Sequence, residues 1–313
     1  METQPRARIL VTGGAGFIGS HVVDQLISRG YEPVVIDNLS SGKASNINSH
    51  AKFYEVDITD QAHLSKVFDK EKPEMILHYA AQTSVAFSIE NPSFDARVNI
   101  IGSLNVFEAA RKYRARRIVL ASTGGAIYGE PKTLPCQEDD VINPLAPYGI
   151  SKMSMEHFSN SYRLYGLDVV TLRLGNVYGP RQDPNGEAGV IAIFSGKMLS
   201  GEDIVVYGKG DQQRDFVFVD DVVDASMKAL FSKGVGVYNI SSGLGVTVNA
   251  IIDKLRNLLN WRGKVKHQPA RAGEVFKIYL SSVKALNAFG WEAKISLDEG
   301  LKKTATYIDS QIR

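Results

Sequence analysis

The chain has 313 residues, 44% of them hydrophobic and 22% charged, with a formal net charge of +2. This length and composition are typical of a globular protein with one large α/β domain and an appended lobe. A charge so close to zero favours neither nucleic acid nor an anionic membrane as a partner. A single cysteine excludes an intramolecular disulfide, and no apolar run reaches the roughly 20 residues of a membrane span, so we expect a cytoplasmic protein.

A glycine-rich turn near the amino terminus is the most informative motif. Residues 8–11 are apolar enough for a buried strand, and residues 22–27 have apolar positions at helical spacing. Gly13, Gly16 and Gly19 therefore occupy a turn from strand to helix. Glycines permit a tight turn there, allow the backbone to approach a pyrophosphate and pack the helix closely on the strand. The pyrophosphate would lie at the helix N-terminus, so the turn predicts a dinucleotide site.

An acidic residue, Asp37, closes the next apolar run at residues 33–36. An acid at this distance from the glycines hydrogen-bonds the ribose hydroxyls of the adenosine. Because it would repel a 2′-phosphate, NAD is favoured over NADP. The polar loop that follows is expected to contact the adenosine end of NAD through Asn38, Ser40, Ser41 and Gly42.

Apolar runs of strand length alternate with helical patterns along the next part of the chain. They lie at residues 52–56, 60–71, 75–78, 93–113, 117–121 and 147–165. This alternation predicts an α/β fold with a doubly wound parallel sheet of the Rossmann type, whose ligand lies beyond the carboxyl ends of the strands. Further cofactor contacts are expected from the glycine turn and from these strand ends and helices: Phe17, Ile18, Asp57, Ile58, Tyr79, Ala80, Ala81, Gln82, Asn99, Ser122, Tyr148 and Lys152.

Tyr148 and Lys152 are one helical turn apart, so their side chains share a face. A phenol with a pKa of about 10 is a poor base at neutral pH. A neighbouring ammonium favours the phenolate and brings its pKa into a working range. The hydroxyls of Ser122 and Thr123 follow the strand at 117–121, so the sequence predicts a site that moves a proton beside NAD.

With these residues the chain resembles the extended short-chain dehydrogenase/reductase family. Residues 172–181 are similar to the family's passage into its substrate lobe, and residues 213–221 to its later signature. Within the family, the chain is most similar to nucleotide-sugar epimerases of the UDP-glucose/UDP-galactose 4-epimerase type. The resemblance implies an NAD-binding domain at 1–175, with a return segment near 215–235. It also implies a smaller, discontinuous α/β substrate lobe at 176–313.

The resemblance implies NAD-dependent epimerisation at C4 of a UDP-hexose through a transient 4-keto sugar. Tyr148 would remove the O4 proton, Lys152 would tune Tyr148 and hold the nicotinamide ribose, and Thr123, with Ser122 as the alternative, would hydrogen-bond O4. Relatives that dehydrate nucleotide sugars place acids directly after the threonine, because elimination needs a further acid and base. Here Gly124 and Gly125 follow Thr123. Many similar epimerases have a third hydroxyl where this chain has Gly124.

The resemblance also implies which residues bind the UDP-sugar. Arg214 and Arg271 would hold the diphosphate, since guanidinium groups suit phosphate oxygens. The full expected set is Thr123, Tyr148, Asn176, Gly189, Val190, Val206, Tyr207, Arg214, Arg271 and Glu274. No cluster of histidine, cysteine or carboxylate residues has metal-ligand spacing, so no metal is expected. The helices at 93–113 and 147–165 are those with which the family forms homodimers through a four-helix bundle.

Other functions remain open at this point. The sugar could be an N-acetylated hexosamine or a uronate in place of glucose and galactose. A net oxidoreductase or dehydratase on another nucleotide sugar would release reduced cofactor or a deoxy product. A regulator that binds NAD without catalysis would have no need of Tyr148 and Lys152, which weighs against it.

Overall fold

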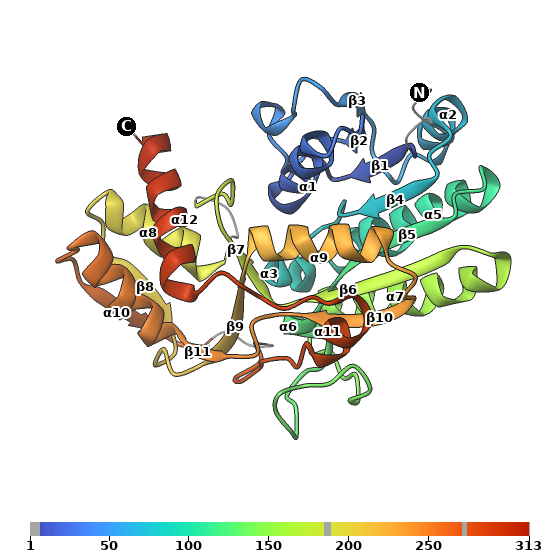
Figure 1. Cartoon of the computed structure of the whole chain (residues 1–313). Helices are drawn as coiled ribbons and strands as arrows, with labels where there is room; N and C mark the ends of the chain where they lie inside the picture. The colour runs from blue at the N-terminus through green and yellow to red at the C-terminus, as the bar shows by residue number, and fades with distance from the viewer. Residues whose placement is uncertain (1–6, 185–188, 271–273, 313) are drawn as a thin grey trace. The chain divides into compact units, whose positions relative to one another are not determined.

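The computed structural model describes residues 7–184, 189–270 and 274–312. Figure 1 traces the chain from blue at its N-terminus to red at its C-terminus. The chain divides into two compact units. The first unit comprises Met1–Ser122, Ala146–Leu172 and Val223–Tyr238, and the second comprises Thr123–Leu145, Arg173–Val222 and Asn239–Arg313. The sequence boundary at 175 differs from this division at residues 123–145, which group with the second unit. Residues 223–238 return to the first unit.

Among the described residues, the main sheet has seven strands in the order β10-β6-β5-β4-β1-β2-β3. Its strands are β1 (Ile9–Thr12), β2 (Val34–Asp37), β3 (Lys52–Glu55), β4 (Met75–His78), β5 (Arg117–Thr123), β6 (Asp168–Leu174) and β10 (Gly236–Ile240). Strands β1 to β5 pair in parallel. Every residue of β1, β2 and β4 is buried, because helices cover both faces of a parallel sheet. The predicted doubly wound fold is confirmed.

Helices alternate with these strands as the sequence predicts. They are α1 (Phe17–Ser28), α2 (Gln61–Glu71), α3 (Val85–Glu90), α4 (Pro92–Ala96), α5 (Ser103–Lys112), α7 (Pro147–Tyr162) and α9 (Val219–Phe231), with 3₁₀ turns η1 (Ala44–Asn46) and η3 (Arg163–Tyr165). Apolar side chains of α2, α5 and α7 form one core with the strands, including Leu10, Phe68, Ile76, Phe107 and Met155.

The helix expected at 93–113 runs without a break in helical structure from Pro92 to Lys112 but changes its winding. Between α4 and α5 lies η2 (Arg97–Gly102), a π-helical segment. Such segments occur mostly as single turns inside α-helices and are frequent at functional sites. This one contains Asn99, which is fully buried, and ends at Gly102, where a Cβ would lie 2.7 Å from the side chain of Ile58. Sequence periodicity did not reveal this local change.

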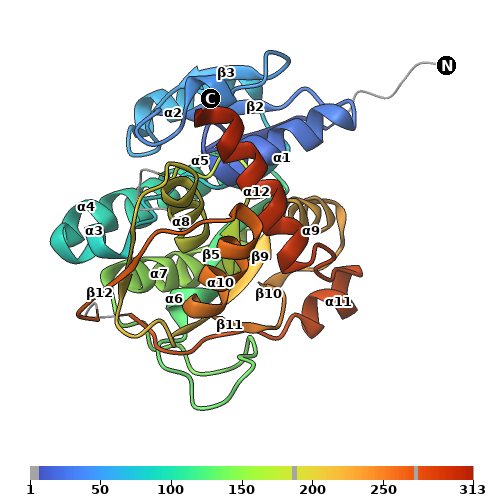
Figure 2. The same ribbon diagram turned by 90° about the vertical axis from the view of Figure 1, so that its left-hand side faces the viewer.

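The second unit holds two small sheets with helices of its own (Figure 2). Its elements are α6 (Gly124–Ile127), β7 (Asn176–Tyr178), α8 (Val190–Leu199), β8 (Ile204–Tyr207), β9 (Gln213–Phe218), β11 (Gly245–Thr247), α10 (Val248–Leu259), β12 (Val265–Gln268), α11 (Val283–Phe289) and α12 (Leu297–Ile312). One sheet has the order β11-β9-β7 and the other pairs β12 with β8. Helices α8, α10 and α12 pack against one another.

No helix within the described ranges is long and apolar enough to cross a membrane.

Candidate active site

The glycine turn has the close packing that the sequence predicts. Gly13 has φ +70° and donates its N–H to the carbonyl of Ile36 at 2.8 Å. A Cβ at Gly13 would lie 2.6 Å from the backbone nitrogen of Ala80, and one at Gly19 would lie 2.1 Å from the carbonyl oxygen of Gly13. Side chains at these positions would therefore separate β1 from α1 and from the end of β4.

The N-terminus of α1 fits a pyrophosphate. Gly16 is the N-cap, and among the described residues no side chain caps the helix and no acid lies in its first turn. Backbone N–H groups at such an end lack partners within the helix and attract an anion. Glycine at the cap leaves space for close approach, so these residues fit the dinucleotide predicted from the sequence.

Asp37, at the end of β2, is 7% exposed and hydrogen-bonds both the glycine turn and the loop that follows β2. One carboxylate oxygen accepts the N–H of Ala15 at 3.0 Å, and the other accepts the N–H of Leu39 at 2.8 Å. A Cβ at Gly42 would lie 2.9 Å from the carboxylate of Asp37. The loop from Asn38 to Gly42 thus stands beside a fixed negative charge, which favours ribose hydroxyls over a 2′-phosphate.

Asn38 links this loop to Asp57, the next predicted contact. The Asn38 side chain donates to Asp57 at 2.7 Å and accepts from the backbone and hydroxyl of Ser40. Although burial raises the pKa of the Asp57 carboxyl, hydrogen bonds from Thr59 and Asn38 bring it below its ordinary value. Asp57 is therefore ionised at neutral pH, and its donors hold it at the strand end.

The contacts of Asn99 are with protein groups around Gln82. Its side-chain oxygen accepts the N–H of Gln82 at 2.9 Å, and its side-chain nitrogen donates to the Gln82 carbonyl at 3.0 Å. That nitrogen also donates to Asp95 at 3.0 Å. In this structure Asn99 fixes the backbone that follows β4, so its predicted role toward the cofactor would be exerted through Gln82. Tyr79, in the same segment, hydrogen-bonds Ser226 of α9.

The predicted proton-transfer pair lies at the start of α7. Tyr148 is half-buried, and its N–H donates to the hydroxyl of Ser88 at 3.1 Å. Lys152 is 4% exposed, and its ammonium lies 5.9 Å from the centre of the Tyr148 ring. The ammonium also donates to the carbonyl of Ala121 in β5 at 3.0 Å. Burial lowers the pKa of Lys152 to about 8, against the opposing charges of Asp95 and Glu156.

Ser122 contacts a residue that sequence reasoning missed. Its hydroxyl donates to Glu156 at 2.5 Å, and the two side chains are each 4% exposed. Glu156 follows Lys152 by one helical turn, so an acid on the same face of α7 as Lys152 was the signal available in the sequence. Because Ser122 is held by this carboxylate, Thr123 is the better candidate for contact with O4.

In the second unit, Thr123 and Asn176 border the same small space. A Cβ at Gly125 would lie 3.2 Å from the side-chain oxygen of Asn176 and 4.0 Å from the hydroxyl of Thr123. At Gly124 a Cβ would lie 2.2 Å from a methyl group of Leu280. Leu280 thus occupies the space that a side chain at 124 would need, which explains why glycine stands there. A side chain at 125 would therefore contact both Asn176 and Thr123.

The structure brings together two of the predicted nucleotide contacts, Arg214 of β9 and Glu274. Their charged groups lie 4.0 Å apart, and the Arg214 side chain is 16% exposed. Burial lowers the pKa of the Arg214 guanidinium, and Glu274 and Glu130 oppose this shift. Arg271 lies outside the described residues.

The other predicted contacts lie on two elements of the same unit. Gly189 is the N-cap of α8 and Val190 its first residue. Val206 and Tyr207 lie on β8 and pair with His267 and Gln268 of β12. Val206 as a whole is 1% exposed, whereas Tyr207 is partly exposed.

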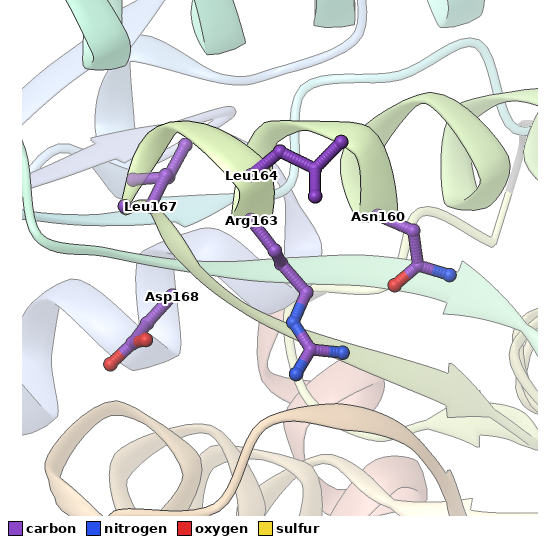
Figure 3. A pocket seen from close by; sticks show the side chains of 6 residues that line it. Asn160, Arg163, Leu164, Leu167 and Asp168 are labelled. Carbon is purple, nitrogen blue, oxygen red and sulfur yellow. The ribbon is translucent and has the colours of Figure 1, made fainter.

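A surface hollow lies at the end of α7, apart from the predicted residues. It is lined by Asn160, Arg163, Leu164, Gly166, Leu167 and Asp168, and Figure 3 shows five of these side chains. None of the predicted site residues lines it. Within the described ranges, no group of three or more histidine, cysteine or acidic residues could hold a metal ion.

Comparison with known proteins agrees with this arrangement. Residues 9–241 match the NAD dependent epimerase/dehydratase family. A protein of Methanocaldococcus jannaschii described as a putative UDP-glucose 4-epimerase is 45% identical over 97% of this chain and 99% of its own. The crystal structure of a UDP-glucose 4-epimerase from Thermotoga maritima with UDP-glucose has a TM-score of 0.96 and 48% identity, covering 98% of this chain and 100% of its own. A Thermus thermophilus UDP-glucose 4-epimerase complex with NAD has a TM-score of 0.93 and 42% identity, covering 96% and 98%.

Proposed function

Because the chain belongs to the NAD dependent epimerase/dehydratase family, we propose that it interconverts UDP-glucose and UDP-galactose by inverting C4. The observation that carries this proposal is the pairing of Tyr148 with the buried ammonium of Lys152 at 5.9 Å. A pure cofactor sensor has no use for a phenol tuned in this way. The absence of a carboxylate directly after Thr123 in the sequence argues against dehydration.

The protein's own groups account for the proton chemistry. Tyr148, as phenolate, takes the proton from O4 as the C4–H bond breaks and a 4-keto sugar forms. The glycine turn and Asp37 would hold NAD, which when bound would supply the acceptor for the C4 hydride and the donor that returns it to the opposite face of the sugar. Tyr148 would then return the proton to O4. Because the hydride goes back to C4, oxidation and reduction cancel. Lys152 keeps positive charge beside the phenol, and Thr123 donates a hydrogen bond to O4.

The second unit supplies the groups proposed for the nucleotide. Asn176 beside Thr123 would donate to the diphosphate, and Arg214 would add a bidentate contact. Glu274, fixed 4.0 Å from Arg214, would accept from the ribose hydroxyls. Gly189 and Val190 at the start of α8, and the backbone of Val206 and Tyr207, would enclose the uracil.

The first experiment incubates purified protein with UDP-galactose and no added cofactor. We expect UDP-glucose to appear by NMR without accumulation of NADH by absorbance, because bound NAD is regenerated in each turnover. Net NADH, or a keto or deoxy sugar, would replace the proposal with an oxidoreductase or dehydratase. Conversion of only an N-acetylated or uronate substrate would keep the epimerisation but change the sugar.

We also propose a homodimer formed through a four-helix bundle. Its support is a set of exposed apolar side chains on neighbouring helices of the first unit: Phe94 at 50%, Ile101 at 50%, Ile150 at 47% and Phe158 at 44% exposure. Helix α7 packs beside both α4 and η2, so these side chains belong to one helical layer. Four large apolar groups left in water would favour association.

Replacing Ile101 and Phe158 by glutamate is expected to convert the dimer into a monomer, because the charges would be buried in the bundle. Light scattering after size-exclusion chromatography should give a mass near 34.3 kDa for this variant and twice that for the wild type. Leu244→Glu is the control, since Leu244 is 66% exposed in the second unit. A monomeric wild type, or a variant that stays dimeric, would contradict the bundle.

A cytoplasmic location remains a proposal. Its support is the single cysteine, whose thiol is buried and whose pKa burial raises to about 11, so that it suits neither disulfide formation nor redox chemistry.

A further inference from the structure

Three buried polar residues surround the proposed catalytic lysine, Lys152, or lie next to its contacts. Lys152 and Glu156 lie on α7, Asp95 on α4 and Ser122 at the end of β5. Asp95 is 0% exposed and the other three are each 4% exposed. The proposed chemistry names Lys152 and leaves both carboxylates unexplained. Burying two carboxylates is costly unless each has partners, so their contacts indicate what they do.

Glu156 and Lys152 together hold the end of β5. Lys152 donates to the carbonyl of Ala121 at 3.0 Å, and Glu156 accepts from the hydroxyl of Ser122 at 2.5 Å. The two side chains are one helical turn apart, so a single face of α7 fixes two successive residues of the strand. Thr123 is the next residue, and its backbone is positioned by the same contacts.

Asp95 approaches the lysine from a different helix. It accepts hydrogen bonds from Ser151 at 2.5 Å, from Gln82 at 2.8 Å and from Asn99 at 3.0 Å. Three donors suit a carboxylate, which has about four acceptor positions. Ser151 precedes Lys152, so Asp95 fixes the turn of α7 that carries the lysine. Its negative charge and that of Glu156 both act on the Lys152 ammonium.

We propose that Glu156 is a positioning residue of the reaction, which fixes Ser122 and, with Asp95, keeps Lys152 positively charged beside Tyr148. This inference rests on the proposed function. Without the carboxylates, an ammonium buried to this depth would lose its proton readily, and Tyr148 would lose the charge that favours its phenolate.

The remaining titratable groups that face Lys152 do not supply this negative charge. His78, on β4, is 2% exposed, and burial, with the charge of Lys152, lowers its pKa to about 3. It is therefore neutral at working pH, where it bridges Thr12 and Ser103. Tyr148 is the group whose phenolate the Lys152 ammonium stabilises, so it is not a source of negative charge for the lysine. Asp95 and Glu156 are left as the two carboxylates that act on the lysine.

The test replaces Glu156 by glutamine, which keeps the shape and a hydrogen-bond acceptor for Ser122 but removes the charge. The pKa of Lys152 should then fall below its value of about 8. Because the ammonium form of Lys152 is the working form, activity would begin to fall at a lower pH than in the wild type when the pH is raised. We expect the alkaline limb of kcat/KM to move down by about one pH unit. Glu71→Gln is the matched control, because Glu71 is 5% exposed and bonds Lys52 and Tyr54 away from α7.

A second readout does not depend on turnover. The ¹³Cε resonance of Lys152, assigned by its loss in Lys152→Met, reports its titration directly in lysine-labelled protein. We expect the Lys152 titration to move to lower pH in Glu156→Gln and to stay at its wild-type position in Glu71→Gln. Asp95→Asn should move it in the same direction from the other helix. Circular dichroism establishes that each variant is folded.

The outcomes separate this inference from the proposed function. A wild type without epimerase activity would overturn the proposed function, whereas a shifted Lys152 titration would still support the charge cluster. An active Glu156→Gln with a wild-type alkaline limb and an unshifted Lys152 resonance would overturn the inference alone. If Glu156→Gln does not fold, the Lys152 titrations of Asp95→Asn and of the wild type test the inference instead. A wild-type Lys152 that is already neutral below pH 7 would contradict the proposal.

Discussion

Tyr148→Phe is expected to lower kcat for UDP-galactose by about 10²–10⁴-fold, the usual contribution of a positioned acid or base. The phenylalanine ring would fill the same half-buried position, and the N–H of residue 148 would still donate to Ser88, as it does at 3.1 Å. The start of α7 should therefore be unchanged. The group lost is the hydroxyl that takes and returns the O4 proton. Binding of NAD and of UDP should be retained, since neither depends on that proton.

NMR of the sugar mixture gives the rate, and calorimetry gives the affinities for NAD and UDP. Tyr165→Phe is the matched control, because Tyr165 is 67% exposed at the far end of the same helical segment and should show wild-type turnover. A loss of NAD binding in Tyr148→Phe would indicate a structural role. Wild-type turnover would overturn the proposed mechanism.

Gly19→Ala is expected to abolish useful NAD binding and to destabilise the first unit. The added Cβ would lie 2.1 Å from the carbonyl oxygen of Gly13, a backbone atom that cannot rotate away. Helix α1 would have to move from β1, taking with it the N–H groups that face the pyrophosphate. Overpacking of this kind costs about 1–3 kcal/mol. We expect the dissociation constant for NAD to rise at least about 100-fold, or roughly 2.7 kcal/mol.

Calorimetric titration of NAD and thermal unfolding test this expectation. Gly16→Ala provides the contrast, because its Cβ would lie 3.2 Å from the Gly13 oxygen and would require only a small adjustment. That variant should fold normally but bind NAD more weakly, since the methyl group stands where the pyrophosphate approaches. Ser28→Ala, at the other end of α1, should change neither property. Wild-type NAD affinity in Gly19→Ala would contradict the role given to the turn.

Much of the fold could be predicted because its signals are local. The apolar run at 75–78 coincides with β4, and the helix predicted at 60–71 agrees with α2 to within one residue. The glycine turn, Asp37 and the spacing of Tyr148 and Lys152 are also short patterns. Each pattern indicates either a backbone conformation or a set of side chains on one helix face. Both depend on residues close in sequence, through steric limits on the backbone and the periodicity of the helix. The parallel, doubly wound character of the sheet was predicted from the alternation of strands and helices, whereas the order of its strands came from the structure.

Tertiary structure alone decided the surroundings of the candidate site. The contact of Ser122 with Glu156 spans 34 residues, and that of Ser151 with Asp95 spans 56. The clash that keeps residue 124 a glycine comes from Leu280, and the partner of Arg214 is Glu274. No local pattern encodes such pairs, because they arise when distant segments pack and a buried charge must find a partner wherever the fold places one. The sequence by itself determined where the glycine turn and the proposed catalytic pair lie. Packing determined which buried groups hold them and set the charge beside Lys152.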